Sequence, residues 1–203
     1  YYEHRLIPFE DVYYNGQIIE KHELLKAFLL SGKLNMPTAK KLKIIEGRIM
    51  EKAREMKNIR RGKIEDAVNK LNNHEFEIKS FTRVIAAKET QMLADRLRKF
   101  TEFESFELYK KLFSDINIFK KISKGLNLPE NIEEVISYTN SSLNDPFNIP
   151  YADGIALMYL KLKAEGCDLF GGIKQVVVDE AQDYYPIHYH ILKNLYKYAR
   201  FTI

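Results

Sequence analysis

Two adjacent carboxylates follow a short β-branched run near the end of the chain. Residues 175–178 read Gln-Val-Val-Val, Asp179 and Glu180 come next, and Gln182 and Asp183 follow after one alanine. The valine run predicts a buried strand. Successive side chains of an extended chain point in opposite directions, so the two neighbouring carboxylates can serve two purposes at one place. Nucleotide hydrolysis has two such needs, because one group must hold Mg²⁺ and another must orient the attacking water.

A strand that ends in acidic residues also has a simpler explanation. Acidic side chains often end strands or precede helices, because the positive end of the helix dipole favours them. Asp183 stands close to Pro186, which is expected to open the next helix. For Asp179 and Glu180 alone both explanations stay open, and it is Gln182 that favours the catalytic one.

The run from Val176 to Asp183 resembles motif II, the Walker B box, of superfamily 1 helicases of the UvrD and Rep type. The five positions of their Asp-Glu-x-Gln-Asp signature are all filled. Residues 153–160 are similar to the acidic and apolar helix before this motif, and residues 184–195 to the proline-containing helix after it. His188 stands where such proteins often carry Gln.

The resemblance implies the ATPase of a nucleic-acid motor, with ATP and Mg²⁺ as cofactors. It implies that Asp179 coordinates the Mg²⁺ and that Glu180 is the general base for water. It further implies that Gln182 and Asp183 couple the nucleotide state to neighbouring motifs. Glu180 and Gln182 are therefore expected to be catalytic, and Asp179 and Asp183 to bind the cofactor.

The loop that cradles phosphates in such enzymes, Gly-x-x-x-x-Gly-Lys-Ser/Thr, has no match in the chain. Gly32-Lys33 and Gly62-Lys63 lack the upstream glycine and are followed by Leu and Ile. Without the backbone amides and the lysine of that loop, the phosphates have no cradle. We therefore expect that this chain alone does not turn over ATP at a significant rate. The chain also begins without Met and stops inside an expected strand, which predicts a segment of a longer protein.

Helical spacing of apolar residues dominates the first 140 residues, where no strand is expected. Predicted helices cover residues 21–30, 38–61, 64–71, 77–100, 106–113, 116–122 and 129–138, with Gly62 at a break or an end. Residues 140–150, rich in Asn, Ser, Asp and Pro, read as a linker. A helix that ends at Gly166, a strand, a helix from Pro186 and a strand at 200–203 follow, and in such an α/β layout ligands lie beyond the carboxyl ends of strands.

The predicted fold class is therefore mainly α with a small α/β part. In the resembled family, a largely helical insertion separates the phosphate loop from motif II. Residues 1–145 fit such an insertion subdomain, and residues 146–203 fit part of a RecA-like P-loop ATPase domain. The helical part looks most like the helicase D group, which resembles UvrD but acts on bacterial RNA polymerase.

Two functions follow from the resemblance. In the first, the chain is part of an ATP-driven helicase or translocase whose partner is DNA, expected to be single-stranded. In the second, the helical part is an interaction module of an ATP-driven factor that remodels or recycles bacterial RNA polymerase.

A basic segment bears on the choice between these functions. The net charge of +4 is modest, but Lys40–Arg61 holds nine Lys or Arg against three Glu. Lys41, Arg48 and Lys52 could grip phosphates, and binding would then weaken steeply with salt. The alternative is a solvated helix face, which the interleaved glutamates favour.

The cysteine content, the length of the apolar runs and the spacing of the histidines exclude several other classes of protein. Cys167 is the only cysteine, so no internal disulfide can form, and a reducing compartment such as the cytoplasm is expected. The apolar runs are far shorter than the ~20 residues that cross a bilayer, and no membrane partner is expected. His188 and His190 stand two apart, unlike the i,i+4 pair of a zinc site. The oligomeric state stays undecided.

Overall fold

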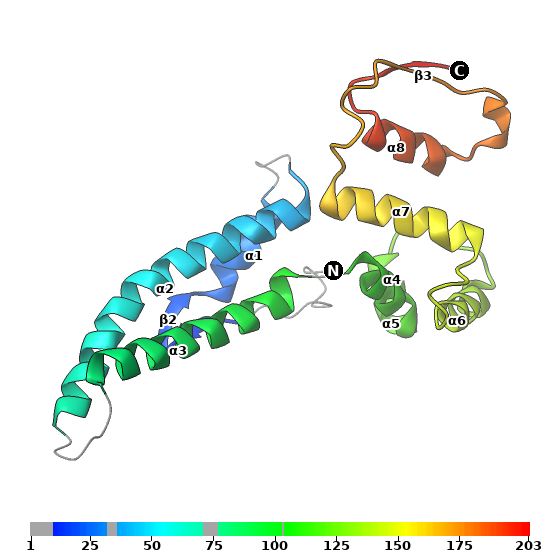
Figure 1. Cartoon of the computed structure of the whole chain (residues 1–203). Helices are drawn as coiled ribbons and strands as arrows, with labels where there is room; N and C mark the ends of the chain where they lie inside the picture. Colours follow the sequence, from blue (N-terminus) through cyan, green and yellow to red (C-terminus); the bar gives the residue numbers. More distant parts are fainter. Residues whose placement is uncertain (1–9, 32–35, 71–76, 103) are drawn as a thin grey trace. The chain divides into compact units, whose positions relative to one another are not determined.

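The computed structural model describes residues 10–31, 36–70, 77–102 and 104–203 of the chain (Figure 1). These residues form two compact units, the first of residues 10–31, 39–70 and 77–102 and the second of residues 36–38 and 104–203. The fold is mainly helical with two small sheets, which confirms the predicted mainly α class with a minor strand content. None of the helices in the described ranges is long and apolar enough to cross a membrane.

A β-hairpin opens the first unit. Strands β1 (Val12–Tyr14) and β2 (Gln17–Glu20) pair antiparallel. Asn15 and Gly16 between them have φ angles of 50° and 76°, and two left-handed residues are what a two-residue type I′ turn requires. The expectation of no strand before residue 140 was therefore wrong. The dipeptide Asn-Gly was the signal that could have found this hairpin.

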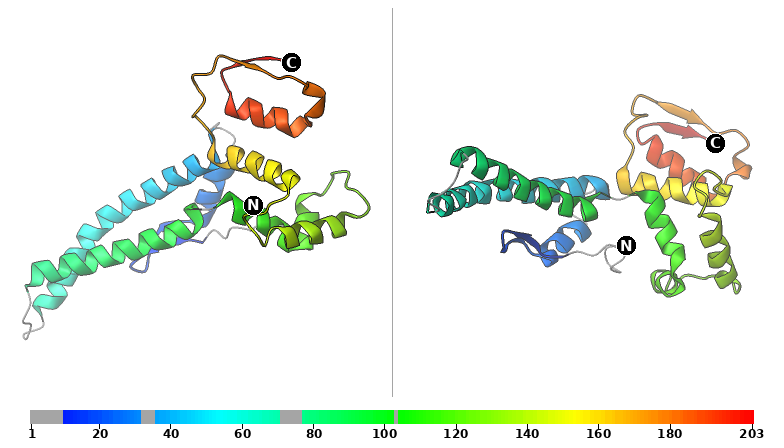
Figure 2. Two further views of the ribbon diagram at one scale, coloured as in Figure 1. Left: turned by 45° about the vertical axis from the view of Figure 1, so that its right-hand side comes forward. Right: turned by 60° about the horizontal axis from the view of Figure 1, so that its bottom comes forward.

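Three helices complete the first unit: α1 (His22–Leu30), α2 (Thr38–Asn69) and α3 (Ile78–Thr101). Figures 1 and 2 show α2 and α3 lying side by side as a long pair. Apolar residues at helical spacing fill the core, with Leu42, Ile45, Ile49 and Ala53 from α2 and Ala86, Leu93 and Leu97 from α3. Arg60 binds Glu89 with two guanidinium nitrogens, at 3.0 and 3.2 Å to one carboxylate oxygen, and this contact raises the pKa of Arg60.

Helix α2 runs through Gly62 without a break, so the predicted interruption there was wrong. A glycine inside a helix costs about 1 kcal/mol relative to alanine. Packing on both sides outweighs that cost, because Ile64 and Val68 continue the buried stripe of α2 and Arg60 is tied to α3. Local propensity is thus overridden by tertiary contacts.

The second unit begins with four helices: α4 (Ser105–Ser114), α5 (Ile116–Ile122), α6 (Ile132–Ser142) and α7 (Tyr151–Glu165). Two side-chain hydrogen bonds tie α4 to α7. The Tyr109 hydroxyl donates to Asp153 at 2.8 Å, and the Ser105 hydroxyl donates to Glu165 at 2.9 Å. Helix α6 begins three residues after the expected Pro129, whose carbonyl instead accepts the N–H of Ile132 in a turn.

The division between the compact units lies near residue 102 and not at the predicted boundary of 145 and 146. Helix α4 packs against both α6 and α7, which joins the stretch before residue 145 to the stretch after it. The predicted boundary at 145 and 146 concerns a resemblance to a helical insertion and to part of a RecA-like domain, which the compact units do not test. It stays a prediction.

A parallel two-stranded sheet and one helix form the end of the second unit. Strands β3 (Gln175–Val177) and β4 (Arg200–Thr202) pair in parallel, and α8 (Pro186–Leu195) connects them and packs against α7. The expected burial of the valine strand was wrong, because Val177 is 69% exposed whereas Val176 and Val178 are half-buried. Only one face of this sheet is covered by the described residues.

Candidate functional site

The candidate site is the loop at the carboxyl end of β3. The strand ladder extends one residue past β3, because the Val178 N–H donates to the Thr202 carbonyl at 2.9 Å. Asp179 and Glu180 follow at once. The sequence prediction that two carboxylates leave the carboxyl end of a strand is therefore confirmed in position, at the edge where ligands lie in parallel sheets.

Glu180 adopts the left-handed conformation, with φ 49° and ψ 45°. A residue with a Cβ atom is uncommon there, and such strained positions gather at functional sites. Two hydrogen bonds hold the turn: Asp179 Oδ1 accepts the Glu180 N–H at 2.9 Å, and the Glu180 carbonyl accepts the Asp183 N–H at 2.9 Å. This turn places the side chains of both Asp179 and Glu180 in exposed positions directly after the strand.

The four predicted site residues lie together on this loop and its short 3₁₀ helix η1 (Ala181–Asp183), and all four are exposed. The Gln182 amide donates to Glu180 Oε2, so the amide fixes the carboxylate predicted to act on water. Asp179 uses only Oδ1 within the described part of the chain. Its second carboxylate oxygen and the carboxylate of Asp183 stay available to a ligand.

The donor set fits Mg²⁺ held in its usual way. Mg²⁺ keeps several waters and takes one or two carboxylates together with substrate phosphates, and Asp179 offers one such carboxylate. Among the residues that the structure describes, no group of three or more His, Cys, Asp or Glu side chains is placed to hold a metal ion. A cation here would thus depend on water and phosphate for most of its ligands.

Helix α8 anchors the far end of the loop. The Ala181 carbonyl accepts both the Tyr189 hydroxyl at 2.7 Å and the Tyr184 N–H at 3.3 Å. His188 accepts the N–H of Tyr185 at the start of the helix. Tyr189 was not among the predicted site residues. Its sequence signal was weak, since it only stands off the apolar stripe of the helix.

The basic face of α2 was the second candidate surface. Lys41, one of the three residues considered there as phosphate ligands, is buried. Its ammonium donates to the carbonyls of Leu29 at 3.1 Å and Ser31 at 3.0 Å, at the end of α1. The last carbonyls of a helix have no partner within it, so a lysine there satisfies them and complements the dipole. Lys41 is therefore a helix cap.

The other two residues considered as phosphate ligands also have partners within the first unit. Lys52 pairs with Glu20 at 2.8 Å, and the Arg48 guanidinium carbon lies 5.8 Å from the ring centre of Phe28. These contacts support the explanation of α2 as a structural and solvated helix, and they supply no evidence of a phosphate grip at these three positions.

Comparison with known proteins gives no family for this chain. No protein-family model matches it, and no match to a curated protein was found.

Proposed function

We propose that this chain supplies the Mg²⁺-binding and water-activating half of the ATPase site of a superfamily 1 type helicase or translocase. The observation that carries the proposal is the run Asp179-Glu180-Ala181-Gln182-Asp183 at the carboxyl end of a parallel strand, with Glu180 in a left-handed turn. No other feature of the described residues combines carboxylates, position in a sheet and backbone strain.

Each residue then has a task. Mg²⁺ bound with ATP neutralises phosphate charge, and Asp179 would hold it through the oxygen that the turn leaves available. Glu180 would accept the proton of the attacking water, which is the usual contribution of a positioned carboxylate. Gln182 would hold the Glu180 carboxylate in place through the bond already formed. Asp183 would contact the cofactor or a neighbouring motif.

One face of the small sheet is exposed, which favours the proposal that this sheet is part of a larger RecA-like domain. Parallel sheets are normally covered on both faces, yet Val177 on one face of this sheet is 69% exposed. Such apolar exposure fits a sheet that is covered by further parts of an ATPase. A phosphate loop would belong to those parts, since this chain has none.

The test uses a protein in which this segment is joined to a phosphate loop. Glu180→Gln should leave ATP binding near normal and lower nucleic-acid-stimulated hydrolysis by about 10²-fold or more, the scale of general base catalysis. Glu134→Gln, which changes an exposed glutamate of α6, is the matched control and should keep full turnover. Near-normal hydrolysis in the Glu180→Gln protein would refute the assignment of the base.

A second test needs only this chain. Mn²⁺ is a paramagnetic substitute for Mg²⁺ and should broaden the amide signals of residues 178–184 at substoichiometric amounts. Asp179→Asn should remove that broadening. Equal broadening in the variant would refute Asp179 as the ligand, and so would broadening spread evenly over acidic surface residues.

The second candidate function is a protein-interaction module for bacterial RNA polymerase. The observation that favours it is the internal use of Lys41, Arg48 and Lys52, which weakens the case for nucleic acid at α2. Purified polymerase and labelled single-stranded DNA should be tested against the whole chain at two salt concentrations. Retention of polymerase without salt-sensitive DNA binding supports the interaction module, and the reverse result supports the translocase.

A further inference from the structure

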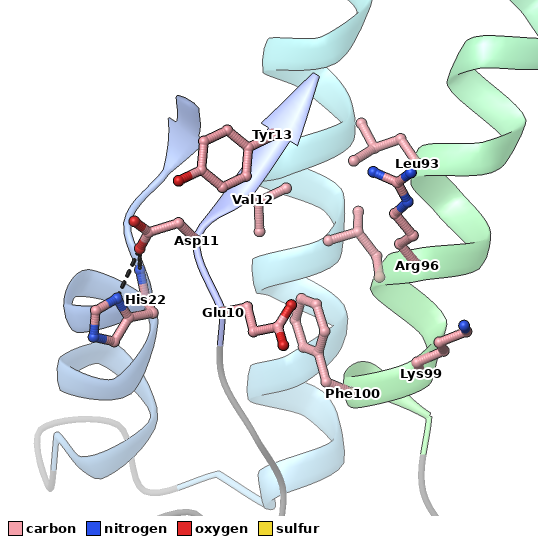
Figure 3. Close-up of a pocket in the computed structure, with 10 residues that line it drawn as sticks. Glu10, Asp11, Val12, Tyr13, His22, Leu93, Arg96, Lys99 and Phe100 are labelled. Carbon is pink, nitrogen blue, oxygen red and sulfur yellow. Dashed lines mark hydrogen bonds and ion pairs between the residues drawn. The ribbon is translucent and has the colours of Figure 1, made fainter. Parts of the chain in front are cut away.

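A cavity of about 730 Å³ lies beside β1 in the first unit (Figure 3). One wall is formed by four consecutive residues, Glu10 to Tyr13. The opposite wall is formed by the last turns of α3, from Leu93 to Phe100, and His22 at the start of α1 also lines the space. The volume falls in the range of ligand-binding clefts, about 300–1,000 Å³.

The cavity follows the backbone edge of β1. Neighbouring side chains of a strand point to opposite faces, so a cavity over one face would be lined by alternate residues. Here Val12 and Tyr13 both line it. Within the described part of the chain β1 pairs only with β2, and residues 10–14 form no backbone hydrogen bond outside the hairpin. The edge of β1 thus has no strand partner among the described residues, and it borders a groove.

The wall opposite that edge is basic. Arg96 and Lys99 of α3 are exposed, and neither forms an ion pair with a side chain that the structure describes. Arg98, which stands between them and does not line the cavity, is paired with Asp95 and Glu102. Two cations with no ion-pair partner among the described side chains thus line the groove from the same helix.

The base of the groove is apolar, because Val12, Leu93 and Leu97 are nearly completely buried. The β1 side carries carboxylates. Asp11 is already engaged with the backbone N–H of His22 at 2.8 Å and with its ring at 2.7 Å, both through Oδ1. Glu10 is exposed beside it. The ligand must therefore present hydrogen-bond donors toward β1 and negative charge toward α3.

We propose that this groove binds an extended, acidic peptide segment of a partner protein, which adds to β1 as a third strand. The backbone amides of an extended peptide are the donors that an open strand edge accepts, and addition of a strand is an established mode of peptide recognition. Acidic side chains at alternate positions would pair with Arg96 and Lys99 through charge-assisted hydrogen bonds. A DNA backbone fits poorly, because a phosphodiester chain carries no N–H or O–H donor for the edge of β1. The proposal is independent of the ATPase assignment.

The test is an NMR titration of the ¹⁵N-labelled whole chain with an acetylated and amidated six-residue peptide of alternating Glu and Val. Shift changes should concentrate on residues 11–14 and on Arg96 and Lys99. The same peptide with Lys in place of Glu should not bind detectably. A peptide N-methylated at alternate positions, prepared in both registers, should lose binding in the one register whose amides face β1.

Substitutions on α3 test whether Arg96 and Lys99 contribute to the affinity for the acidic peptide. The double change Arg96→Gln and Lys99→Gln should weaken binding of the acidic peptide about tenfold or more, because it removes two charge-assisted contacts. Arg98→Gln should leave the affinity unchanged. The peptide comparison needs no variant, so it decides the question even if the double variant folds poorly.

Three results would overturn the proposal. Full binding of both N-methylated peptides would exclude strand pairing. Equal binding of the lysine peptide would exclude the basic wall as the source of selectivity. Absence of any peptide binding, or displacement of the peptide by a thymidine oligonucleotide that shifts the same amides, would assign the groove to another role.

Discussion

The imidazole Nδ1 of His188 accepts the backbone N–H of Tyr185 at 3.0 Å. The other ring nitrogen, Nε2, lies 3.2 Å from the Tyr151 hydroxyl. His188 is the third residue of α8, the position at which Glu or Gln completes a capping box. The histidine thus provides a side-chain acceptor at the start of α8, directly after the acidic loop.

His188→Gln should therefore preserve the start of α8, whereas His188→Ala should loosen it. Loss of a helix cap costs about 1 kcal/mol, so we expect hydrogen exchange in the first turn of α8 to accelerate about fivefold in the alanine variant. His190→Ala changes an exposed histidine of the same helix and should leave those rates unaltered. If Gln proves as disruptive as Ala, the capping role is wrong.

Asp11 gives the first unit an acid-sensitive contact. The hydrogen bonds from the backbone N–H of His22 and from its side chain lower the pKa of Asp11 below the ordinary 3.8. A carboxyl group whose pKa is lower in the folded state adds stability above its unfolded pKa and loses it as the pH falls through the folded value.

We therefore expect the acid-induced fall in melting temperature below pH 3.8 to be shallower in Asp11→Asn than in the native chain, with little difference between the two slopes above pH 5. The measurement is the melting temperature followed by circular dichroism between pH 2.5 and 6. Asp66→Asn, at an exposed site of α2, should keep the native acid slope. Parallel curves of melting temperature against pH for the native chain and Asp11→Asn would show that the contact between Asp11 and His22 adds no stability.

The sequence predicted well the helices whose bounds are determined by residues close to one another in the chain. Helix α5 has the predicted bounds, and α3 differs from its predicted range by one residue at each end. Apolar spacing and a following stop decide such helices within a few turns. The hairpin turn at Asn15 and Gly16 was equally local, and its omission was a missed signal.

The features that the sequence predicted badly depend on distant contacts. The continuity of α2 through Gly62 requires the partner helix α3, which supplies Glu89 for Arg60. The exposure of Val177 depends on what covers the sheet, and three valines are equally compatible with a covered face and an open one. At the candidate site, the order of the acidic residues was readable from the sequence, but the left-handed turn at Glu180 and the bond from Tyr189 to Ala181 were not.

Gly166 ends α7 with a φ angle of 77°, and a Cβ atom there would lie 2.7 Å from Cγ of Pro37. Both the backbone and the space require glycine. Gly166→Ala should lower the free energy of unfolding by about 1–3 kcal/mol, the cost of a strained left-handed residue, with any shift of Pro37 added.

Gly154 lies inside the same helix, and a Cβ atom there meets nothing within 4 Å. Gly154→Ala should therefore stabilise the chain by about 0.5–1 kcal/mol. Urea unfolding of the two variants measures both effects. Similar midpoints for the two alanine variants would contradict the assignment of Gly166 as an obligatory glycine.

The left-handed conformation of Glu180 predicts a conflict between stability and catalysis. The left-handed conformation costs a residue with a Cβ atom about 1–2 kcal/mol of conformational energy, and glycine does not have this cost. Glu180→Gly should therefore be more stable than Glu180→Ala by about 1 kcal/mol in urea unfolding, because both lose the contact with Gln182 and only one keeps the strain.

Both variants should abolish hydrolysis in a protein that also carries the phosphate loop, because both lack the carboxylate. Relief of backbone strain in Glu180→Gly together with loss of activity would mark Glu180 as a residue held in a strained conformation for function. If the glycine and alanine variants unfold at the same urea concentration, Glu180 is not strained in solution. If either variant keeps normal turnover, the carboxylate is not the base, whatever the conformation of the turn.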